Sequence, residues 1–491
     1  MMNIEDFVSI VARFLLSFEL AYYLITLLQW YNYSFYRIVF MHHKFMWHIW
    51  FFLLPLVCSI VLQILDLKEY VMIVAVVLLI ALVLWRLKQD KPLKFTKRVQ
   101  RFFVLCFIFV LLDEGLGILF ETSNPFMHIL SLLFAVVISN LYERVLLKQY
   151  KQIAKDKLEI MSRLKIIAIT ASFGKTSIKN FLFQILSTHF SVYATPRSVN
   201  TLTGIVADIN ENLDYTADIY IAEAGARLKG DIDEIVQFLH PQYAVIGEVG
   251  AQHLEYFKTL ENITNTKFEI LNSSRLRKVF VFEQNTLPKD LDPQKKKLLS
   301  FYPTGCRNIN ATLEGTSFEL EYKGQWYEFK TQILGAFNVA NIAAAVSMAL
   351  ELGMRMSDIQ HSVSKFEPVP HRLQKIFTNQ KLILDDSFNG NLKGMLEAAR
   401  LASLYDGRKV VVTPGIVESN KESNIKLAKY FDEVFDIVII TGTLNAKLFS
   451  TNISKAQKII LHSKESLESI LKACTLPGDL ILFSNDAPNF I

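Results

Sequence analysis

The stretch that decides the fold of this chain is KIIAITASFGKTS at residues 165–177, after which an apolar helical pattern runs to Leu186. Its first part, Lys165–Thr170, is a short apolar run of the kind found in buried parallel strands. Gly174–Thr176 follows where a helix is predicted to start. Backbone N–H groups at such a helix start bind phosphates, the lysine neutralises their charge and the hydroxyl binds Mg²⁺. The pattern predicts a phosphate loop, although the full motif has glycine where this chain has Ile169.

Two further apolar runs end in polar residues downstream of this loop. Ile219–Ala222 is followed by Glu223, and Tyr243–Ile246 leads into a loop that contains His253. In an open parallel sheet, a carboxylate at the carboxyl end of a neighbouring strand is well placed to hold the metal ion of a nucleotide. Helix capping by Glu223 and an ordinary loop position for His253 remain open alternatives.

The remainder of the second half predicts more sheet. Ser317–Tyr322 and Gln325–Lys330 alternate with period two around a Lys-Gly turn, which predicts a hairpin in a small side sheet. After Pro370, strands and helices alternate again, which predicts a second open α/β domain. Its predicted strands lie at residues 381–384, 409–412, 437–441, 458–461 and 479–483.

The first third of the chain is far more apolar than the rest. Of the 491 residues, 51% are hydrophobic and 20% are charged, and the mean hydropathy is +0.27. Each apolar run is close to the ~17–25 residues that a helix needs to cross the hydrocarbon core of a membrane. This argues against an ordinary soluble enzyme and predicts five transmembrane helices, at residues 7–30, 47–66, 70–86, 102–120 and 125–142.

Basic residues predict the orientation of these helices, because Lys and Arg in short loops favour the cytoplasmic side. Residues 86–101 contain seven basic residues, whereas residues 121–125 contain none. The amino terminus is therefore predicted outside and everything after Tyr142 in the cytoplasm, with Lys68 as contrary evidence. Residues 143–165 form a charged helical run, which is either a juxtamembrane connector on anionic lipid or a solvated helix.

Charge and cysteine usage exclude some classes of function. A net charge of +5 over this length does not indicate nucleic-acid binding. The four cysteines form no CxxC and no Cys/His cluster, which predicts reduced thiols and no zinc site. Four charged residues inside the predicted spans are costly in lipid, so either a functional role or pairing between helices is expected: Arg13, Glu19, Asp113 and Glu114.

Seven blocks occur in order along the second part of the chain: TASFGKTS (170–177), ATPRSVN (194–200), AEAGARLKGDI (222–232), IGEVGAQHLEYFKTLENITNTKFEI (246–270), LGAFNVANIAAA (334–345), PVPHRLQ (368–374) and DDSFNGN (385–391). Together they resemble the Mur ligase family, and within it the MurF branch. The resemblance covers roughly residues 160–420. Together with the apolar first third, which it does not cover, it predicts a transmembrane domain at 1–145, a linker at 146–164, an ATP-binding central domain at 165–370 and a carboxy-terminal α/β domain at 371–491.

The resemblance implies an ATP-dependent amide ligase. Enzymes of this branch phosphorylate the carboxylate of a UDP-linked muramoyl tripeptide, and the amine of D-alanyl-D-alanine then attacks the acyl phosphate. Two anions must meet in such a site, so the site needs cations more than it needs a base. The implied cofactors are ATP and two Mg²⁺ ions. The implied partners are these two substrates and, through the first third of the chain, membrane lipid.

The same resemblance implies roles for individual residues around the phosphates and metals. Glu223 and Thr176 would hold the first Mg²⁺, and His253 would help to hold a second. Lys267 falls where the family carries a carbamylated lysine, whose anionic carbamate binds the second metal; an exposed helix lysine is the alternative. The phosphates would be held by Ser172, Gly174, Lys175, Thr176 and Ser177.

Four residues further along are implied to complete the nucleotide site. Asn338 and Asn341 match an adenine-binding block, with Phe337 where the family usually has histidine, although Asn338 is equally suited to capping a helix. Arg372 and Asp386 match residues of the carboxy-terminal domain that contact the γ-phosphate and the ribose. They would complete the site when that domain closes.

Departures from the family pattern keep other functions open. Leu392 replaces the proline that usually follows the last block, and residues 483–488 lack the glycine of the usual ending. A ligase for a different amino acid or polymer is one alternative. A membrane nucleotide-binding scaffold or transport ATPase is another, in which Ala171 and Phe337 mark lost catalysis. Where the family has a UDP-binding domain, the basic loop at 86–101 is the expected contact for the substrate diphosphate. The alternatives are binding through the bilayer, if the substrate is lipid-linked, and a role of these basic residues in topology and lipid-headgroup contact alone.

Overall fold

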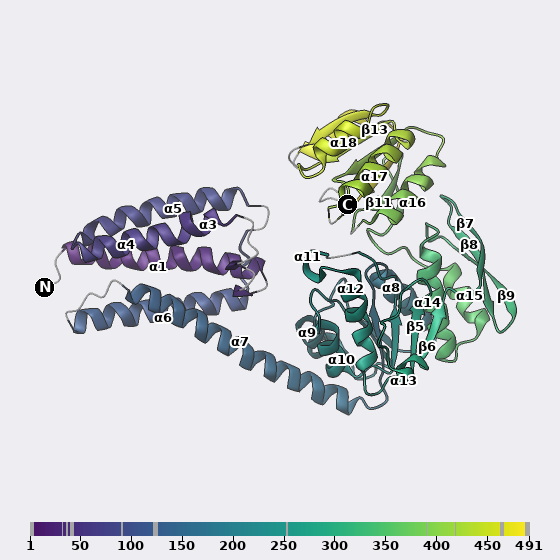
Figure 1. Cartoon of the computed structure of the whole chain (residues 1–491), viewed down its shortest axis with the longest axis horizontal. Helices are drawn as coiled ribbons and strands as arrows, with labels where there is room; N and C mark the ends of the chain where they lie inside the picture. The colour runs from purple at the N-terminus through teal and green to yellow at the C-terminus, as the bar shows by residue number, and fades with distance from the viewer. Residues whose placement is uncertain are drawn as a thin grey trace. The chain divides into compact units, whose positions relative to one another are not determined.

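The structure is a computed structural model of the chain (Figure 1), and it falls into two compact units, Met1–Lys151 and Gln152–Ile491, called unit 1 and unit 2 below. Each unit is described by itself. The residues that the structure describes are 4–31, 33–35, 38–39, 44–89, 92–120, 126–251, 254–388, 390–417, 419–461 and 466–486.

Unit 1 is a bundle of apolar helices (Figure 1). Five stretches of its described helices have the length and composition to cross a membrane, which agrees with the five predicted. Two helices extend further than predicted: α6 begins at Lys97 and so includes three of the seven basic residues, and α7 continues through the charged connector. The elements are α1 (Ile4–Trp30), α3 (Met46–His48), η1 (Ile49–Leu53), α4 (Leu54–Ile64), η2 (Lys68–Tyr70), α5 (Val71–Leu87), α6 (Lys97–Leu119) and α7 (Met127–Ile160).

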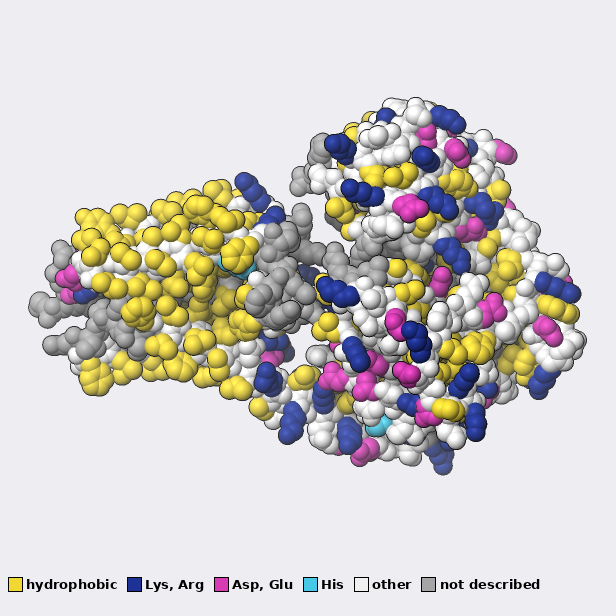
Figure 2. Space-filling view, in the orientation of Figure 1, with side chains coloured by type: hydrophobic (Ala, Val, Ile, Leu, Met, Phe, Trp, Pro, Cys, Tyr) yellow, Lys and Arg dark blue, Asp and Glu magenta, His cyan; other side chains and the backbone are white. Residues whose placement is uncertain are grey.

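The surface of unit 1 is as apolar as its interior. Figure 2 shows hydrophobic side chains over most of the visible face of the bundle. Large side chains such as Val77, Leu84 and Leu119 are 61%, 55% and 72% exposed. Exposed apolar area on this scale indicates a surface that is covered by something other than water. It fits a lipid environment.

Charged side chains inside the bundle are arranged in two ways. Arg13 of α1 forms an ion pair with Glu114 of α6 and also donates to the Ser9 hydroxyl, so pairing between helices accounts for two of the four predicted charges. Glu19 is 4% exposed, and neither of its carboxylate oxygens has a hydrogen-bond partner among the described residues. At the other end, Arg98 donates to Asn140 and stacks 3.4 Å from the Tyr33 ring centroid.

Unit 2 begins with a six-stranded parallel sheet in the order β2-β3-β1-β4-β5-β6. The predicted strands after Leu164, Asp218 and Gln242 are confirmed as β1, β3 and β4. Because β1 lies between β3 and β4, the loop after β1 lies beside the carboxyl ends of both neighbours. The strands are β1 (Lys165–Thr170), β2 (Val192–Ala194), β3 (Ile219–Glu223), β4 (Tyr243–Ile246), β5 (Lys278–Phe282) and β6 (Leu299–Tyr302).

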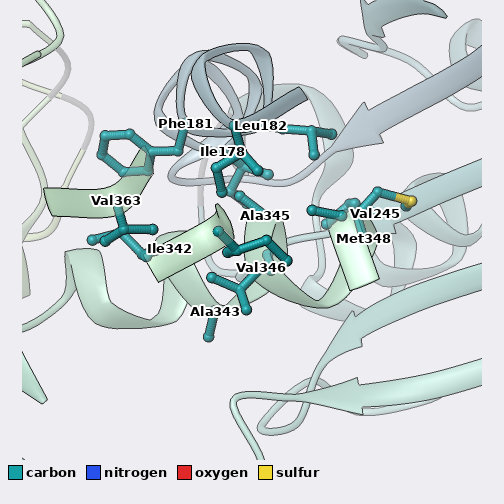
Figure 3. Close-up of a cluster of buried hydrophobic side chains, with 14 of the residues drawn as sticks. Ile178, Phe181, Leu182, Val245, Ile342, Ala343, Ala345, Val346, Met348 and Val363 are labelled. Atoms are coloured by element: carbon teal, nitrogen blue, oxygen red, sulfur yellow. The ribbon is translucent and has the colours of Figure 1, made fainter. Parts of the chain in front are cut away.

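Helices cover both faces of this sheet. One face carries α8 and α14, whose apolar side chains interlock in the buried cluster of Figure 3. Small residues such as Ala345 let α14 pack closely against Ile178 and Leu182 of α8. The helices are α8 (Lys175–Leu186), α9 (Leu202–Asn212), α10 (Asp231–Leu239), α11 (Leu254–Phe257), α12 (Leu260–Phe268), η3 (Glu269–Asn272), α13 (Pro293–Lys296), α14 (Asn338–Glu351) and α15 (Met356–Ser364).

The predicted hairpin is confirmed as β8 (Thr316–Tyr322) and β9 (Gln325–Thr331), with full antiparallel register. A third strand, β7 (Cys306–Ala311), extends this side sheet and was not predicted. Its register with β8 shifts between Arg307 and Asn310, so the strict alternation that marks a strand in sequence is broken there.

A second six-stranded sheet follows in the order β10-β11-β15-β12-β13-β14. All five predicted strands are present, and β10 is an additional antiparallel edge strand. The turn between β10 and β11 is Asn379-Gln380, both with positive φ, and it lacks the glycine that usually marks such a hairpin. The elements are β10 (Gln374–Thr378), β11 (Lys381–Asp386), α16 (Leu392–Ser403), β12 (Lys409–Thr413), α17 (Lys421–Val434), β13 (Ile437–Thr441), α18 (Ala446–Asn452), β14 (Gln457–Leu461), α19 (Leu467–Cys474) and β15 (Leu480–Ser484).

Candidate nucleotide and metal site

The predicted phosphate loop connects β1 to α8. Gly174 has φ of +83° at the start of α8, and a Cβ there would collide with the amide of Asn341, so the position requires glycine. The backbone N–H groups of Ser172 and Phe173 donate to the carbonyl of Glu248, which ties the loop to the segment after β4. The loop therefore has a defined shape before any ligand is considered.

Lys175 is the first residue of α8, and its side chain folds over the loop. Its ammonium donates to the carbonyls of Ala171 and Ser172. Burial lowers the pKa of Lys175 to about 8; Glu223 opposes this shift and Arg372 adds to it. The ammonium of Lys175 therefore lies at the phosphate loop itself.

The other predicted loop residues take different positions. Ser177 is 6% exposed, whereas Thr176 is half-buried. The Ser172 hydroxyl donates to the carbonyl of Gly250, and so links the loop a second time to the segment after β4. Of these hydroxyls, that of Thr176 is therefore the more accessible to a ligand.

Glu223 ends β3 directly beside the end of β1, where it is in register with Ile169. Its side chain is 1% exposed, and neither carboxylate oxygen has a hydrogen-bond partner among the described residues. Oε1 lies 2.9 Å from the ammonium of Lys179, which is an ion-pair distance without hydrogen-bond geometry. Buried carboxylates normally accept hydrogen bonds, so this one retains the capacity to bind a cation. The donor set fits Mg²⁺, which prefers carboxylate oxygens.

Lys179 is a site residue that the sequence analysis missed. Its ammonium donates to the carbonyls of Thr195 and Arg197 and pairs with Glu223, and the side chain is 3% exposed. The signal in the sequence was the spacing from Lys175, because residues four apart share one face of a helix. That face was predicted to be apolar, so a lysine on it required a buried partner.

Lys267 lies in the last turn of α12 and is 4% exposed, which rules out the alternative of an exposed helix lysine. Burial lowers its pKa well below the ordinary range, and the charge of Lys175 lowers it further, while Asp231 and Glu269 oppose the shift. A lowered pKa increases the uncharged fraction of the amine, which is the nucleophilic form. His253, predicted at the same metal, lies outside the described residues.

Asn338 and Asn341 lie in the first turn of α14. Asn338 donates to the carbonyl of Leu334, and Asn341 donates to the side-chain oxygen of Asn338. Asn338 does not cap the helix, because the cap residue is Phe337 and no side chain bonds to the free N–H groups. The oxygen of Asn341 faces Gly174, so this pair lies against the phosphate loop. Phe337 instead packs against the hydrophobic core of the second sheet.

Arg372 precedes the first strand of the second sheet, and Asp386 is the last residue of β11. The Arg372 guanidinium donates to the carbonyl of Phe388 and lies 4.6 Å from that ring's centroid. Burial lowers the pKa of Arg372, whereas the charges of Asp386 and Glu223 raise it. Burial raises the pKa of Asp386 to about 6, and Arg372 opposes this. Arg372 therefore interacts electrostatically with residues of both sheets.

A histidine–aspartate pair beside Arg372 was also missed. Nδ1 of His371 lies 2.7 Å from Oδ2 of Asp385, which is fully buried. The hydroxyl of Ser387 lies 3.4 Å from the same nitrogen. Because both partners share one ring nitrogen, the three residues are not arranged as a nucleophilic relay. The pair instead connects the Pro-His-Arg segment to β11.

Comparisons with known proteins agree with this geometry. Residues 169–349 match the Mur ligase middle domain. The UDP-N-acetylmuramoyl-tripeptide--D-alanyl-D-alanine ligase of Bacillus subtilis is 27% identical over 354 residues, which are 68% of this chain and 75% of that protein. The Escherichia coli enzyme of the same name is 27% identical over 53% of this chain and 59% of its own length, so this chain spans only about three fifths of that relative.

Solved structures share the fold. The crystal structure of the MurF ligase of Thermotoga maritima in complex with ADP superposes with a TM-score of 0.60 at 23% identity, and it covers 69% of this chain and 80% of that one. A likeness at this identity concerns the arrangement of the sheets and helices. It supports the fold and does not assign a substrate.

Proposed function

We propose that this chain, which is a MurF-like Mur ligase in its second unit, is a membrane-anchored ATP-dependent ligase that adds D-alanyl-D-alanine to a UDP-N-acetylmuramoyl tripeptide in peptidoglycan precursor synthesis. The observation that carries the proposal is the convergence of Lys175, Glu223 and Lys267 on the phosphate loop. A site that brings two anions together requires this combination of cations and metal ligands.

The reaction proceeds in two steps. A carboxylate oxygen of the tripeptide attacks the γ-phosphorus of ATP and ADP leaves, which gives an acyl phosphate. The amine of D-alanyl-D-alanine then attacks the acyl carbon, phosphate leaves and the amine releases a proton. Negative charge develops on phosphoryl oxygens in the first step and on the carbonyl oxygen in the second. ATP is the phosphoryl donor, and ADP is the product that an assay follows.

The loop residues provide the contacts to ATP in this proposal. Lys175 neutralises the β- and γ-phosphates, and its low pKa costs little because phosphate charge stabilises the ammonium. Asn338 and Asn341 contact the nucleotide from the start of α14, as their position against Gly174 supports. The remaining phosphate contacts come from Ser172, Gly174, Thr176 and Ser177.

Glu223 and Thr176 are the proposed ligands of a first Mg²⁺, which would supply charge neutralisation between the phosphates. The unpartnered oxygens of Glu223 support this assignment. The amine of Lys267 is proposed to add to carbon dioxide and lose a proton, giving a carbamate that, together with His253, would hold a second Mg²⁺. The depressed pKa of Lys267 supports that step, because only an uncharged amine can add to carbon dioxide.

Arg372 and Asp386 are proposed to contact the γ-phosphate and the ribose from the carboxy-terminal domain. The electrostatic interaction of Arg372 with Glu223 supports this position. We place the domain boundaries at 1–145, 146–164, 165–370 and 371–491, because the second sheet begins directly after Arg372.

Unit 1 is proposed to be a multi-pass membrane domain with its amino terminus outside and the catalytic unit in the cytoplasm. Its apolar exterior and five long helices support this. Residues 86–101 remain the proposed contact for the diphosphate of the UDP-linked substrate, except that Arg98 and Arg101 already bond to Asn140 and Glu143. Arg86, Lys88, Lys94 and Lys97 are therefore the better candidates among the described residues of this segment.

A ligase with a different amine substrate is the second candidate function. It is favoured by the departures in the sequence after Phe388 and at residues 483–488, which leave the dipeptide contacts unassigned. The nucleotide chemistry would be identical. The two candidates differ only in which amine starts turnover.

The test is an assay of ADP release by the full-length protein in detergent with ATP, Mg²⁺ and the UDP-linked tripeptide, given one amine at a time. D-Alanyl-D-alanine should start turnover, whereas L-alanyl-L-alanine and single amino acids should not. The Lys175→Ala variant is the control for contaminating ATPases. Turnover with another amine would replace the proposed substrate, and absence of ADP with every amine would contradict a ligase.

A further inference from the structure

Lys179 holds one of the most deeply buried charges in unit 2. It lies one turn after Lys175 on α8, and its ammonium has two hydrogen-bond acceptors and one ion-pair partner. The distances are 2.5 Å to the carbonyl of Thr195, 2.7 Å to that of Arg197 and 2.9 Å to Oε1 of Glu223. A lysine is almost never this buried unless its charge is paired. Its position therefore depends on Glu223.

The pair is unusual because the lysine makes hydrogen bonds and the carboxylate makes none. The two carbonyl contacts use two of the three N–H donors of the ammonium, while neither oxygen of Glu223 has a hydrogen-bond partner among the described residues. Lys179 thus offsets the charge of the carboxylate without occupying the oxygens in hydrogen bonds. The free capacity of Glu223 suits a further cation on its other side.

The backbone that Lys179 binds also holds Glu223 in place. Thr195 donates its N–H to the carbonyl of Ile221, and its hydroxyl accepts the N–H of Glu223 at 3.2 Å. Two residues beyond Glu223, Gly225 donates to the carbonyl of Asn200. One ammonium therefore joins α8, the 195–197 segment and the end of β3.

We propose that Lys179 is a positioning residue for the metal–nucleotide complex: it holds the Glu223 carboxylate in place beside the phosphate loop without contacting the nucleotide itself. The two lysines of α8 then have separate tasks, since Lys175 faces the phosphates and Lys179 faces the metal ligand. This inference rests on the proposed function only in assigning Glu223 to magnesium. It does not depend on which amine or carboxylate the enzyme joins.

The test measures nucleotide affinity with and without Mg²⁺. Full-length protein in detergent binds adenylyl imidodiphosphate, a non-hydrolysable ATP analogue, in calorimetry with either excess EDTA or excess Mg²⁺. In Lys179→Met, affinity in EDTA should stay within about twofold, because the phosphate loop is intact. The gain in affinity from Mg²⁺ should fall by about 10–100-fold, the usual cost of losing a partner of a metal ligand.

A second pair of variants separates this role from a structural one. Lys179→Met leaves a buried carboxylate without a partner and can destabilise the fold, whereas Lys179→Met with Glu223→Gln removes both charges. In the Glu223→Gln background, Lys179→Met should change the Mg²⁺ gain by less than about twofold, because its target is already gone. Lys165→Met, at the start of β1, is the matched control and should change neither affinity.

Two results would overturn the inference. One is equal loss of affinity with and without Mg²⁺, which is the behaviour of a lysine that only supports the fold. The other is an undiminished Mg²⁺ gain in a folded Lys179→Met protein. If the unaltered protein shows no Mg²⁺ gain, the magnesium assignment of the proposed function fails and this inference fails with it. Failure of the ligase substrates alone would leave all these measurements unaffected.

Discussion

Both units bury an acid–base pair, and the two pairs differ in what they leave unsatisfied. In unit 1, Arg13 donates to both carboxylate oxygens of Glu114 and to the Ser9 hydroxyl. In unit 2, Lys179 lies at ion-pair distance from Glu223, whose oxygens accept no hydrogen bond from any described residue. We call the Arg13–Glu114 pair the closed pair, because both carboxylate oxygens accept hydrogen bonds. We call the Lys179–Glu223 pair the open pair, because neither carboxylate oxygen does.

The difference teaches how to separate a structural pair from a site. A pair whose hydrogen-bonding groups are all used has no capacity for a ligand, and it contributes to helix packing. A pair with a bare carboxylate is costly unless a further cation binds. We therefore interpret Arg13–Glu114 as a contact between α1 and α6, and Glu223 as part of the reaction site.

The largest expected loss of activity is at Glu223, which belongs to the open pair, and at the nearby Lys175. Lys175→Ala and Glu223→Ala should each lower ligation by about 10³-fold or more, since each removes charge neutralisation worth ~4 kcal/mol or more at the meeting point of two anions. ADP release in the presence of both substrates measures this. Lys165→Ala is the control, and near-normal ADP formation in either site variant would remove that residue from the site.

The closed pair should affect stability and not chemistry. Glu114→Leu leaves Arg13 buried without a partner and should cost roughly 3–5 kcal/mol of unfolding free energy, whereas Arg13→Leu with Glu114→Leu should recover most of it. Thermal unfolding in detergent measures both. Nucleotide affinity should not change in either variant. A changed affinity would show that the bundle pair acts on the site.

Lys267→Ala tests the second metal. The variant should lose about 10²-fold in activity, because the carbamate that would hold the metal is absent. Acetate or formate should restore part of the activity by supplying carboxylate oxygens, and they should have no such effect on Lys175→Ala. Full activity of Lys267→Ala without any added carboxylate would contradict the carbamate.

Asp386→Asn should raise the KM for ATP by about tenfold, the value of one charged contact of ~1.4 kcal/mol, and leave the unfolding temperature nearly unchanged. The residue lies at the end of β11, where Arg372 is its electrostatic partner. Initial rates at varied ATP concentration provide the measurement. An unaltered KM would place Asp386 outside the nucleotide site.

The smallest effect is on the pH profile. The pKa of Lys175 is lowered to about 8, so its ammonium is present below that pH and is lost above it. The kcat/KM for ATP should therefore decline by a few-fold between about pH 7.5 and 8.5, since kcat/KM reports the free enzyme. Arg372→Met should move the decline to higher pH, because that charge lowers the pKa. A flat profile to pH 9 would contradict the shift.

Much of the fold was accessible from local patterns. Runs such as Tyr243–Ile246 and Ile437–Thr441 are buried strands with nearly the predicted bounds, because a strand covered on both faces must be apolar throughout. The edge strands β7 and β10 were missed, since the register of β7 shifts between Arg307 and Asn310 and the turn after β10 lacks glycine. Alternation and turn chemistry are weakest where one side of a strand faces solvent.

The candidate site likewise contains residues that could be predicted from the sequence and residues that could not. Lys175 and Glu223 were predicted because each follows a recognisable strand, and strand ends in one parallel sheet must share an edge. Lys179 and the His371–Asp385 pair were not predicted, because their partners come from segments 16–44 and 14 residues away that no local pattern connects. Only packing reveals such contacts.

The sequence by itself determined the apolar first third, the strand–loop–helix of the phosphate loop and where the predicted strands lie along the chain. Each of these depends on hydrophobic periodicity and on residues adjacent in the chain. Tertiary structure decided which charges are satisfied. Arg13 donates to both carboxylate oxygens of Glu114, whereas the oxygens of Glu223 beside Lys179 accept no hydrogen bond from a described residue. Both outcomes depend on the positions of donors far away in sequence. Burial then sets the pKa of Lys175 and Lys267, because desolvation is a property of the packed neighbourhood and not of the residue.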